Sequence, residues 1–203
     1  MNDTGLRSAL TVVLALGVLS TSCGRGPVAP TETASSVFPV LSGAYLGQTP
    51  PGSEPEVFAP GIISTGLAEL NSVFTADGKE FYYAVDTGLD WVIMVTREEE
   101  GIWSEPEGVS FTRGHSGVDL CITRDGQRLF YCSNRSRTGG SELEHNFDIW
   151  YVDRLADGGW SEPTNLEAVN SDSHEFYPSL VDDGTLYFLS RRDDGVGGSD
   201  IHR

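Results

Sequence analysis

The stretch VIMVTREEEGIWSEPEGV (residues 92–109) returns 57 positions later as IWYVDRLADGGWSEPTNL (residues 149–166). Both copies contain the tetrapeptide Trp-Ser-Glu-Pro, at Trp103–Pro106 and at Trp160–Pro163, and apolar residues match on both sides of it. Self-similarity at a fixed spacing is the sequence signature of repeat architectures. The chain is therefore built from repeated units.

Three Asp-Gly pairs lie between runs rich in Val, Ile, Leu, Phe and Tyr, at Asp77–Gly78, Asp125–Gly126 and Asp183–Gly184. Asp-Gly tolerates the positive φ of a tight turn and the flanking residues favour strands, so each pair predicts a β-hairpin. An Asp-Ile pair follows two of the hairpins, at Asp148–Ile149 and Asp200–Ile201, and marks the next strand.

One unit thus contains a strand, an Asp-Gly turn, a strand, a loop, an Asp-Ile strand, Trp-Ser-Glu-Pro and a last strand. Four antiparallel strands in roughly 45 to 58 residues are typical of one blade of a β-propeller. A β-sandwich or an up-and-down barrel has no reason to restart the same strand order. We expect an all-β fold, an incomplete β-propeller of four-stranded antiparallel blades, of which about 2.5 to 3 are present.

The repeated tetrapeptide has a place in such a unit. The indoles of Trp103 and Trp160 offer large apolar faces that can pack between neighbouring blades. Pro106 and Pro163 remove a backbone donor where the chain enters an outer strand, which discourages the addition of further strands there. A sugar-stacking role for the two tryptophans is the alternative.

The sequence contains the motifs FTADGKEFYY, ITRDGQRLFYCSNR, FDIWYV, WSEP, EFYPSLVDDGTLYFLSRRDDGVGGSDI and the lead-in YLGQTPPGSEPEVFAPGIISTG. Together they resemble the PD40 or TolB-like family of WD40-like propellers. The resemblance covers about Tyr45 to Arg203 and implies the propeller fold. Because such repeats occur in bacterial envelope proteins of many kinds, it says little about activity.

We divide the chain into a signal peptide of the lipoprotein type (1–22), a flexible tether rich in Pro, Gly and Ser (23–54), and a partial PD40-type propeller (55–203). The third unit stops inside its Asp-Ile strand, which suggests a fragment of a longer parent or a short chain that closes by oligomerising. In a full ring, residues 55–64 would supply the outer strand of the last blade. The expected blades span about 69–111, 118–170 and 175–203.

The apolar run from Ala9 to Leu19 is too short to span a bilayer comfortably but fits a secretory signal. Leu19–Cys23 resembles a bacterial lipoprotein box, which implies a lipid on Cys23. Secretion with a cleaved leader and a retained anchor are the alternatives. We expect an exported protein, lipid-anchored in the periplasm or at the outer membrane.

The net charge of -17 and the pI of about 4.4 argue against nucleic acid and anionic lipid as partners, since a field of this sign repels them. We expect a protein or glycan ligand in the cell envelope, and membrane contact only through the N-terminal lipid.

Four loops are expected on one side of the disc, at residues 113–117, 133–147, 171–175 and 190–199. Their Arg and His side chains can bind carboxylate or other anionic groups of a ligand, because the guanidinium fork binds such groups bidentately. The alternative is that these arginines pair with nearby aspartates and join neighbouring blades. The candidate ligand-binding residues are Arg113, His115, Arg135, Arg137, His174, Arg191 and Arg192.

No cofactor is expected. The oxygen-rich loop with Asp193, Asp194 and Asp200 is a weak Ca²⁺ candidate that lacks EF-hand spacing, and the four His show no zinc-site spacing. Cys121 and Cys132 flank the second Asp-Gly turn, where one register permits a disulfide and another leaves the two sulfurs diagonal. A disulfide and two buried free thiols are both open.

We expect no catalytic residue. The alternative is a glycan-active hydrolase or lyase similar to six-bladed sialidases, which need an arginine triad, a Tyr with a partner Glu, and an Asp. These residue types occur here without a fixed spacing, and DGGW at 157–160 falls short of the Asp-box that such enzymes repeat. Neither a Gly-x-Ser-x-Gly elbow nor a phosphate-binding loop is present in the sequence.

Overall fold

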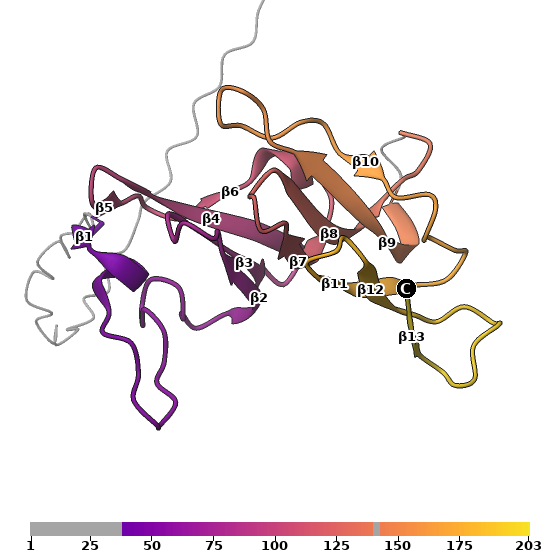
Figure 1. Ribbon diagram of the computed structural model, residues 1–203, viewed down its shortest axis with the longest axis horizontal. Coiled ribbons are helices and arrows are strands. Elements are labelled where there is room, and N and C mark those ends of the chain that lie inside the picture. Colours follow the sequence, from indigo (N-terminus) through magenta and orange to yellow (C-terminus); the bar gives the residue numbers. More distant parts are fainter. Residues whose placement is uncertain (1–37, 140–142) are drawn as a thin grey trace, which may run out of the picture. The chain divides into compact units, whose positions relative to one another are not determined.

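A computed structural model describes residues 38–139 and 143–203 of the chain (Figure 1). These residues form an all-β fold of antiparallel sheets with two short 3₁₀ helices, η1 (Ala44–Gly47) and η2 (Ser110–Thr112). Neither helix has the length and apolar character that crossing a bilayer requires. The expected signal peptide and Cys23 lie outside the described residues.

Three sheets follow one another along the chain, and within each the neighbouring long strands are consecutive in sequence. The first sheet has the order β1-β5-β4-β3-β2, with β6 also paired to β4; the second is β10-β9-β8-β7 and the third β11-β12-β13. The strands are β1 (Leu41–Ser42), β2 (Ala68–Phe74), β3 (Glu80–Asp86), β4 (Trp91–Glu99), β5 (Ile102–Trp103), β6 (Glu107–Gly108), β7 (Gly117–Ile122), β8 (Arg128–Arg135), β9 (Leu143–Asp153), β10 (Thr164–Asn165), β11 (Glu175–Leu180), β12 (Leu186–Ser190) and β13 (Asp200–His202).

The Asp-Gly turns join β2 to β3, β7 to β8 and β11 to β12, which confirms the three predicted hairpins. In the second turn, the Thr123 hydroxyl donates to Asp125 Oδ1 at 2.6 Å and accepts from the Arg128 amide at 2.9 Å. The first turn has the same two bonds, made by Thr75. The hydrogen bond from Thr123, followed by one from the Gln127 amide, lowers the pKa of the Asp125 carboxyl.

Each sheet also has a β-bulge in its first strand, which the sequence analysis did not predict. The register shifts after Leu70, Val118 and Phe176, and the bulged residue six positions before each turn aspartate has a positive φ. Only glycine adopts this conformation without strain, so three non-glycine residues at equivalent places mark a feature common to the units. The bulged residues are Asn71 (φ 50°), Asp119 (φ 54°) and Tyr177 (φ 52°).

In the first two units, the serine of Trp-Ser-Glu-Pro forms hydrogen bonds with the end of the third long strand. The Ser104 amide donates to the Arg97 carbonyl at 2.8 Å, and the Ser104 hydroxyl accepts from the Arg97 amide at 3.1 Å. Ser161 and Asp153 form the same two bonds, at 2.9 and 3.0 Å. The prolines come next and directly precede the outer strands β6 and β10, as predicted.

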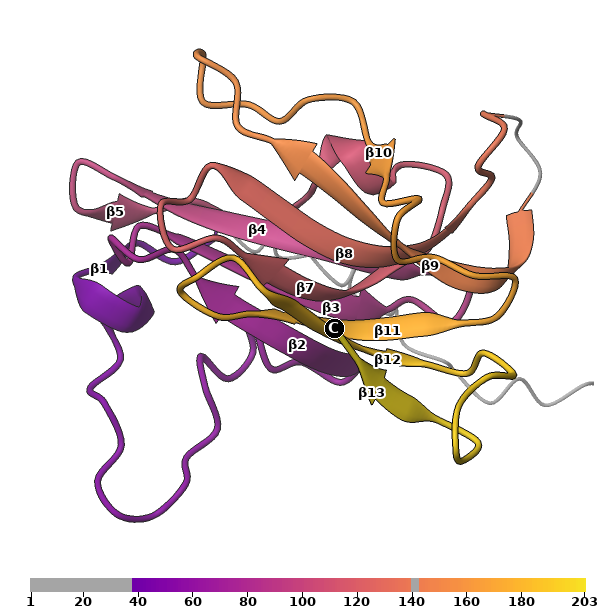
Figure 2. The same ribbon diagram turned by 45° about the vertical axis from the view of Figure 1, so that its right-hand side comes forward.

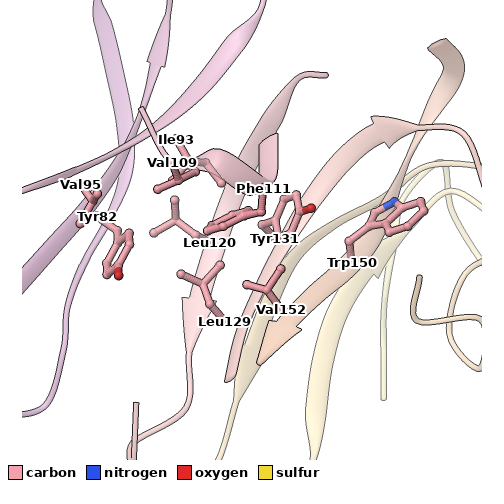
Figure 3. Packing of buried hydrophobic residues seen from close by; sticks show 10 residues of the cluster. All are labelled: Tyr82, Ile93, Val95, Val109, Phe111, Leu120, Leu129, Tyr131, Trp150 and Val152. Atoms are coloured by element: carbon pink, nitrogen blue, oxygen red, sulfur yellow. The ribbon is translucent and has the colours of Figure 1, made fainter. Parts of the chain in front are cut away.

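The sheets cover one another with apolar side chains. One face of the first sheet packs against the second sheet, in a core that includes Tyr82, Ile93, Leu129 and Tyr131 (Figure 3). Full burial of side chains of this kind contributes about 1.5–3 kcal/mol each. Trp160 joins this core, with its ring centroid 6.3 Å from that of Tyr82, so its indole packs between neighbouring units as predicted. The same prediction was wrong for Trp103, which packs against Leu46, Ala59 and Ile63 of the N-terminal segment.

The opposite face of the second sheet packs against the third. Phe130, Cys132 and Ile149 form a second core with Phe188, and β11 lies beside the strands of the second sheet (Figure 2). On the far face of the third sheet Tyr187 and Ile201 are exposed, at 38% and 71%. This face corresponds in register to the covered faces of the two preceding sheets, so it has the side chains for one more packed layer.

The described part of the expected tether packs against the first sheet. β1 pairs with β5, Leu46 is buried, and the Trp103 indole donates to the Gly43 carbonyl at 2.7 Å. Residues 55–64, expected to supply an outer strand, form a turn whose Ala59 and Ile63 are buried against the first sheet. These contacts cover the apolar face of that sheet opposite the second sheet.

Asp119 makes stability depend on pH. It is 5% exposed, and burial raises the pKa of its carboxyl to about 6, opposed by a hydrogen bond from the Tyr177 amide. The folded state therefore holds this proton more tightly than the unfolded chain. The stabilisation is fully present below about pH 4 and is lost as the pH rises through 6.

We predict that Asp119→Asn raises the free energy of unfolding at pH 7.5 by about 2 kcal/mol and changes it little at pH 4. Asn keeps an acceptor for the Tyr177 amide and already occupies the equivalent bulge of the first sheet, at Asn71. Urea unfolding at the two pH values measures the difference, with the exposed Asp182→Asn as the control. An equal effect at both pH values would contradict the prediction.

Candidate functional site

Arg137 has a structural role, because its guanidinium is engaged in hydrogen bonds within the protein. Its guanidinium donates to both carboxylate oxygens of Asp148, which is 2% exposed, and to the Ser171 carbonyl in the connection to the third sheet. Asp172 lies 3.9 Å away. Arg137 therefore neutralises a buried carboxylate and joins the second sheet to the loop before the third, which is the alternative that the sequence left open.

Arg135 in the second sheet and Arg192 in the third also have a structural role, because each donates a hydrogen bond to a backbone carbonyl. The Arg135 Nη2 donates to the Phe111 carbonyl at 2.9 Å, and the Arg192 Nη2 donates to the Val169 carbonyl at 2.6 Å. Each fixes the connection that precedes its own sheet. Arg192 also lies 3.4 Å from Glu175, which is 0% exposed.

Glu175 was missed by the sequence analysis. Its carboxylate accepts hydrogen bonds from Ser171, from the Ser190 hydroxyl at 2.8 Å and from Arg192. A buried carboxylate is stable only with such a set of donors. The loop at 171–175 and the end of β12 are thus brought together, as predicted, but by a buried network.

Two of the predicted arginines, Arg113 and Arg191, are exposed. They lie at the end of the sheets opposite the Asp-Gly turns. Among the described residues, neither Arg113 nor Arg191 takes part in an ion pair, and the Arg191 guanidinium carbon lies 5.9 Å from the centroid of the Phe176 ring. Next to them, His115 Nδ1 lies 3.3 Å from the Arg113 carbonyl, and His174 Nδ1 accepts from the Phe147 amide at 3.1 Å. Of the seven predicted residues, Arg113 and Arg191 are the ones free to meet a ligand.

Cys121 and Cys132 are free thiols in the structure. The register places Cys121 opposite Phe130 and Cys132 opposite Val118, so the two cysteines are not cross-strand partners. Burial raises the pKa of both thiols. A raised pKa keeps a thiol protonated and unreactive near neutral pH.

The weak Ca²⁺ candidate is an open loop. Asp193 and Asp194 are exposed, and Asp200 accepts a hydrogen bond from the Gly197 amide at 3.0 Å. In residues 38–139 and 143–203, no group of three His, Cys, Asp or Glu side chains has a geometry suited to a metal ion.

A cavity of about 800 Å³ lies at the opposite end of the sheets, between the Asp-Gly turns of the first and second sheets. Glu80 lies on its wall and accepts from Arg154 at 3.1 Å, from Arg97 at 3.3 Å and from the Tyr82 hydroxyl at 3.2 Å. The Arg154 guanidinium also covers the Trp160 ring, 3.9 Å from its centroid. Arg154 thus joins the second sheet to the first.

A second cavity, of about 410 Å³, lies between residues 45–58 and the strands β2 and β3. The sequence analysis missed both cavities. The first is lined mainly by residues of the Asp-Gly turns and of the ends of β3, β4 and β9, which come together only when the sheets pack. The second is formed by a segment that was interpreted as tether and outer strand.

No family model matches the sequence, and no curated protein matches it.

We predict that Arg154→Met lowers the free energy of unfolding by about 1–3 kcal/mol, because it removes one partner of the largely buried Glu80 and leaves Arg97 as the other. Arg124→Met is the matched control at the same end of the sheets. Arg124 pairs with Asp182 at 3.3 Å with both side chains 83% exposed, and loss of such a pair costs less than about 0.5 kcal/mol. Equal chemical denaturation curves for the two variants would contradict this role of Arg154.

Proposed function

We propose that the three sheets are successive blades of a PD40-type β-propeller. We further propose that the protein is a non-catalytic binding scaffold for a protein or glycan ligand in the bacterial cell envelope. The main support is that the units repeat a set of local features: a bulge with a positive φ, an Asp-Gly turn and, in the first two, a serine that fastens Trp-Ser-Glu-Pro to the third strand. Radial repetition of one sheet design is the architecture that such features serve.

The packing supports the same proposal. Each of the first two sheets covers the next with one face, and the exposed face of the third sheet, with Tyr187 and Ile201, has the corresponding side chains. In a propeller this face meets another blade. The proposal therefore requires a further sheet, from this or another polypeptide, to pack there.

The surface that we assign to the ligand contains Arg113 and Arg191. The other predicted arginines hold connections or buried carboxylates, so their substitution would report on folding. The two exposed guanidinium groups at one end of the sheets favour a ligand with carboxylate groups, which a guanidinium binds bidentately. Acidic peptides and uronate or sialyl glycans both present such groups.

We predict that the double variant Arg113→Glu/Arg191→Glu binds anionic oligosaccharides at least tenfold more weakly than the wild type, because a charge-assisted hydrogen bond contributes about 1.5–3 kcal/mol. The probes are uronate-containing and sialylated oligosaccharides, followed by calorimetry. Arg124→Glu reverses one charge at the other end of the sheets, as each of the two substitutions does, and should leave binding unchanged.

Mass spectrometry of the same mixtures tests the absence of catalysis. The scaffold leaves the oligosaccharides intact over hours. Product release that one carboxylate substitution abolishes would instead establish the alternative, a glycan-active hydrolase or lyase. Equal affinities for the double variant and the wild type would overturn the assigned surface.

We also propose that the protein is exported and anchored by a lipid on Cys23, on the basis of the apolar run and the lipoprotein-like box before it. We predict that Cys23→Ser moves the protein from the membrane fraction to the soluble periplasmic fraction and removes the mass of the acyl chains. Stable membrane attachment through lipids needs two or more anchoring signals, so loss of the acyl chains should release the protein. Unchanged membrane association of the variant would point to the retained anchor.

A further inference from the structure

The cavity of about 410 Å³ beside the first sheet has no charged residue in its wall, although the chain has 43 Asp, Glu, Lys and Arg residues in all. Aromatic and proline rings form most of the wall, and Val73, two hydroxyl-bearing side chains and one amide complete it. A volume of this size, mostly apolar with a few polar groups, is typical of small-molecule sites. The wall residues are Tyr45, Gln48, Thr49, Pro50, Pro51, Phe58, Ser72, Val73, Phe74 and Phe81.

The cavity is held in shape by contacts around it. The Gln48 side chain donates to the Val57 carbonyl at 3.1 Å and accepts from the Ala59 amide at 2.7 Å, so it ties the two N-terminal segments of the wall together. The Tyr45 ring meets the Phe74 ring edge-on, at 5.6 Å and 90°. The Tyr45 and Phe74 rings therefore pack edge-to-face in the cavity wall.

Unusual backbone geometry sets the direction of several side chains of the wall. Tyr45 and Leu46 both have positive φ values, 54° and 56°, which non-glycine residues rarely adopt. The bulge at Asn71 shifts the register of β2 next to Ser72 and Val73. Bulges re-aim side chains and are frequent beside binding sites.

The chemistry of the wall selects the class of ligand. An ion would lose its hydration without gaining a charged partner, which is costly. The hydroxyls of Tyr45, Thr49 and Ser72 make no side-chain hydrogen bond to another described residue, so they are available to a polar ligand. An uncharged sugar ring presents both kinds of surface, with C–H faces for the aromatic rings and hydroxyls for these three groups.

We propose that this cavity binds an uncharged pyranose ring of a glycan, with Tyr45 as its exposed wall. Tyr45 is 47% exposed, whereas Phe81 at the base is 4% exposed, so a ring can enter past Tyr45 and rest against the phenylalanines. The site narrows the ligand class of the proposed scaffold and rests on that function, but it is separate from Arg113 and Arg191.

The test uses the full chain and the methyl glycosides of glucose, galactose and N-acetylglucosamine as probes, observed by ligand NMR and calorimetry. At least one probe should bind with a Kd on the order of 1 mM, as expected for a ligand of this size. Tyr45→Ala should weaken it at least tenfold, Thr49→Val and Ser72→Ala less. The matched control is Tyr187→Ala, which removes an exposed tyrosine of the third sheet and should bind like the wild type.

Thermal unfolding of each variant shows whether it is folded, and Tyr45→Phe keeps the ring if Tyr45→Ala does not fold. Failure of all three glycosides to bind would overturn the proposal, as would binding by folded Tyr45→Ala that equals that of the wild type. If only Tyr45→Phe folds, it lacks the hydroxyl assigned to the ligand and should bind more weakly than the wild type; equal binding would then overturn the proposal. Tyr45-dependent binding of an apolar dye without any sugar would overturn it in favour of an apolar ligand. Binding of anionic oligosaccharides tests the scaffold function separately. It should depend on Arg113 and Arg191 and should be the same in the wild type and in the Tyr45 variants.

Discussion

The structure depends on the burial of sheet faces that are apolar on both sides. Tyr82 and Phe81 are neighbours in β3 and point to opposite faces, and both are buried, one against the second sheet and one against the N-terminal segment. A sheet of this composition is stable only when both faces are covered. This requirement explains why residues 41–63 pack onto the first sheet, and it gives the exposed Tyr187 and Ile201 their significance.

The local features of the units could be predicted from the sequence because they are made by residues close together in the chain. The pair Asp125–Gly126 was enough to predict the hairpin of β7 and β8, and the place of Trp160 in the repeat was enough to predict that it packs between units. The bulges could not be predicted in this way, because Asn71, Asp119 and Tyr177 share no residue type. What they share is their distance from the turn, which becomes visible only when the strands are paired.

The candidate site was predicted less well than the fold, and the arginines show why. Arg113 and Arg137 look alike in the sequence, since both lie in polar loops with glycine nearby. Arg137 meets Asp148, 11 residues away, and the Ser171 carbonyl, 34 residues away, because two sheets come together. Long-range packing therefore decides which arginine is part of the fold and which remains available. The same holds for Tyr45 and Phe58, which acquire a shared cavity only through the clamp made by Gln48.

The closing of the first two hairpins by a threonine and an aspartate of their own turns has a consequence for biosynthesis. Thr123, Asp125 and Arg128 complete their hydrogen bonds within six residues, so β7 and β8 can pair as soon as this stretch leaves the ribosome. Contacts of low sequence separation form fastest, and domains begin to fold from the N-terminal side during synthesis. The sheets are therefore suited to sequential docking, in which each newly made hairpin packs onto a sheet that has already formed. The apolar face of the new hairpin is then exposed to other nascent chains only briefly.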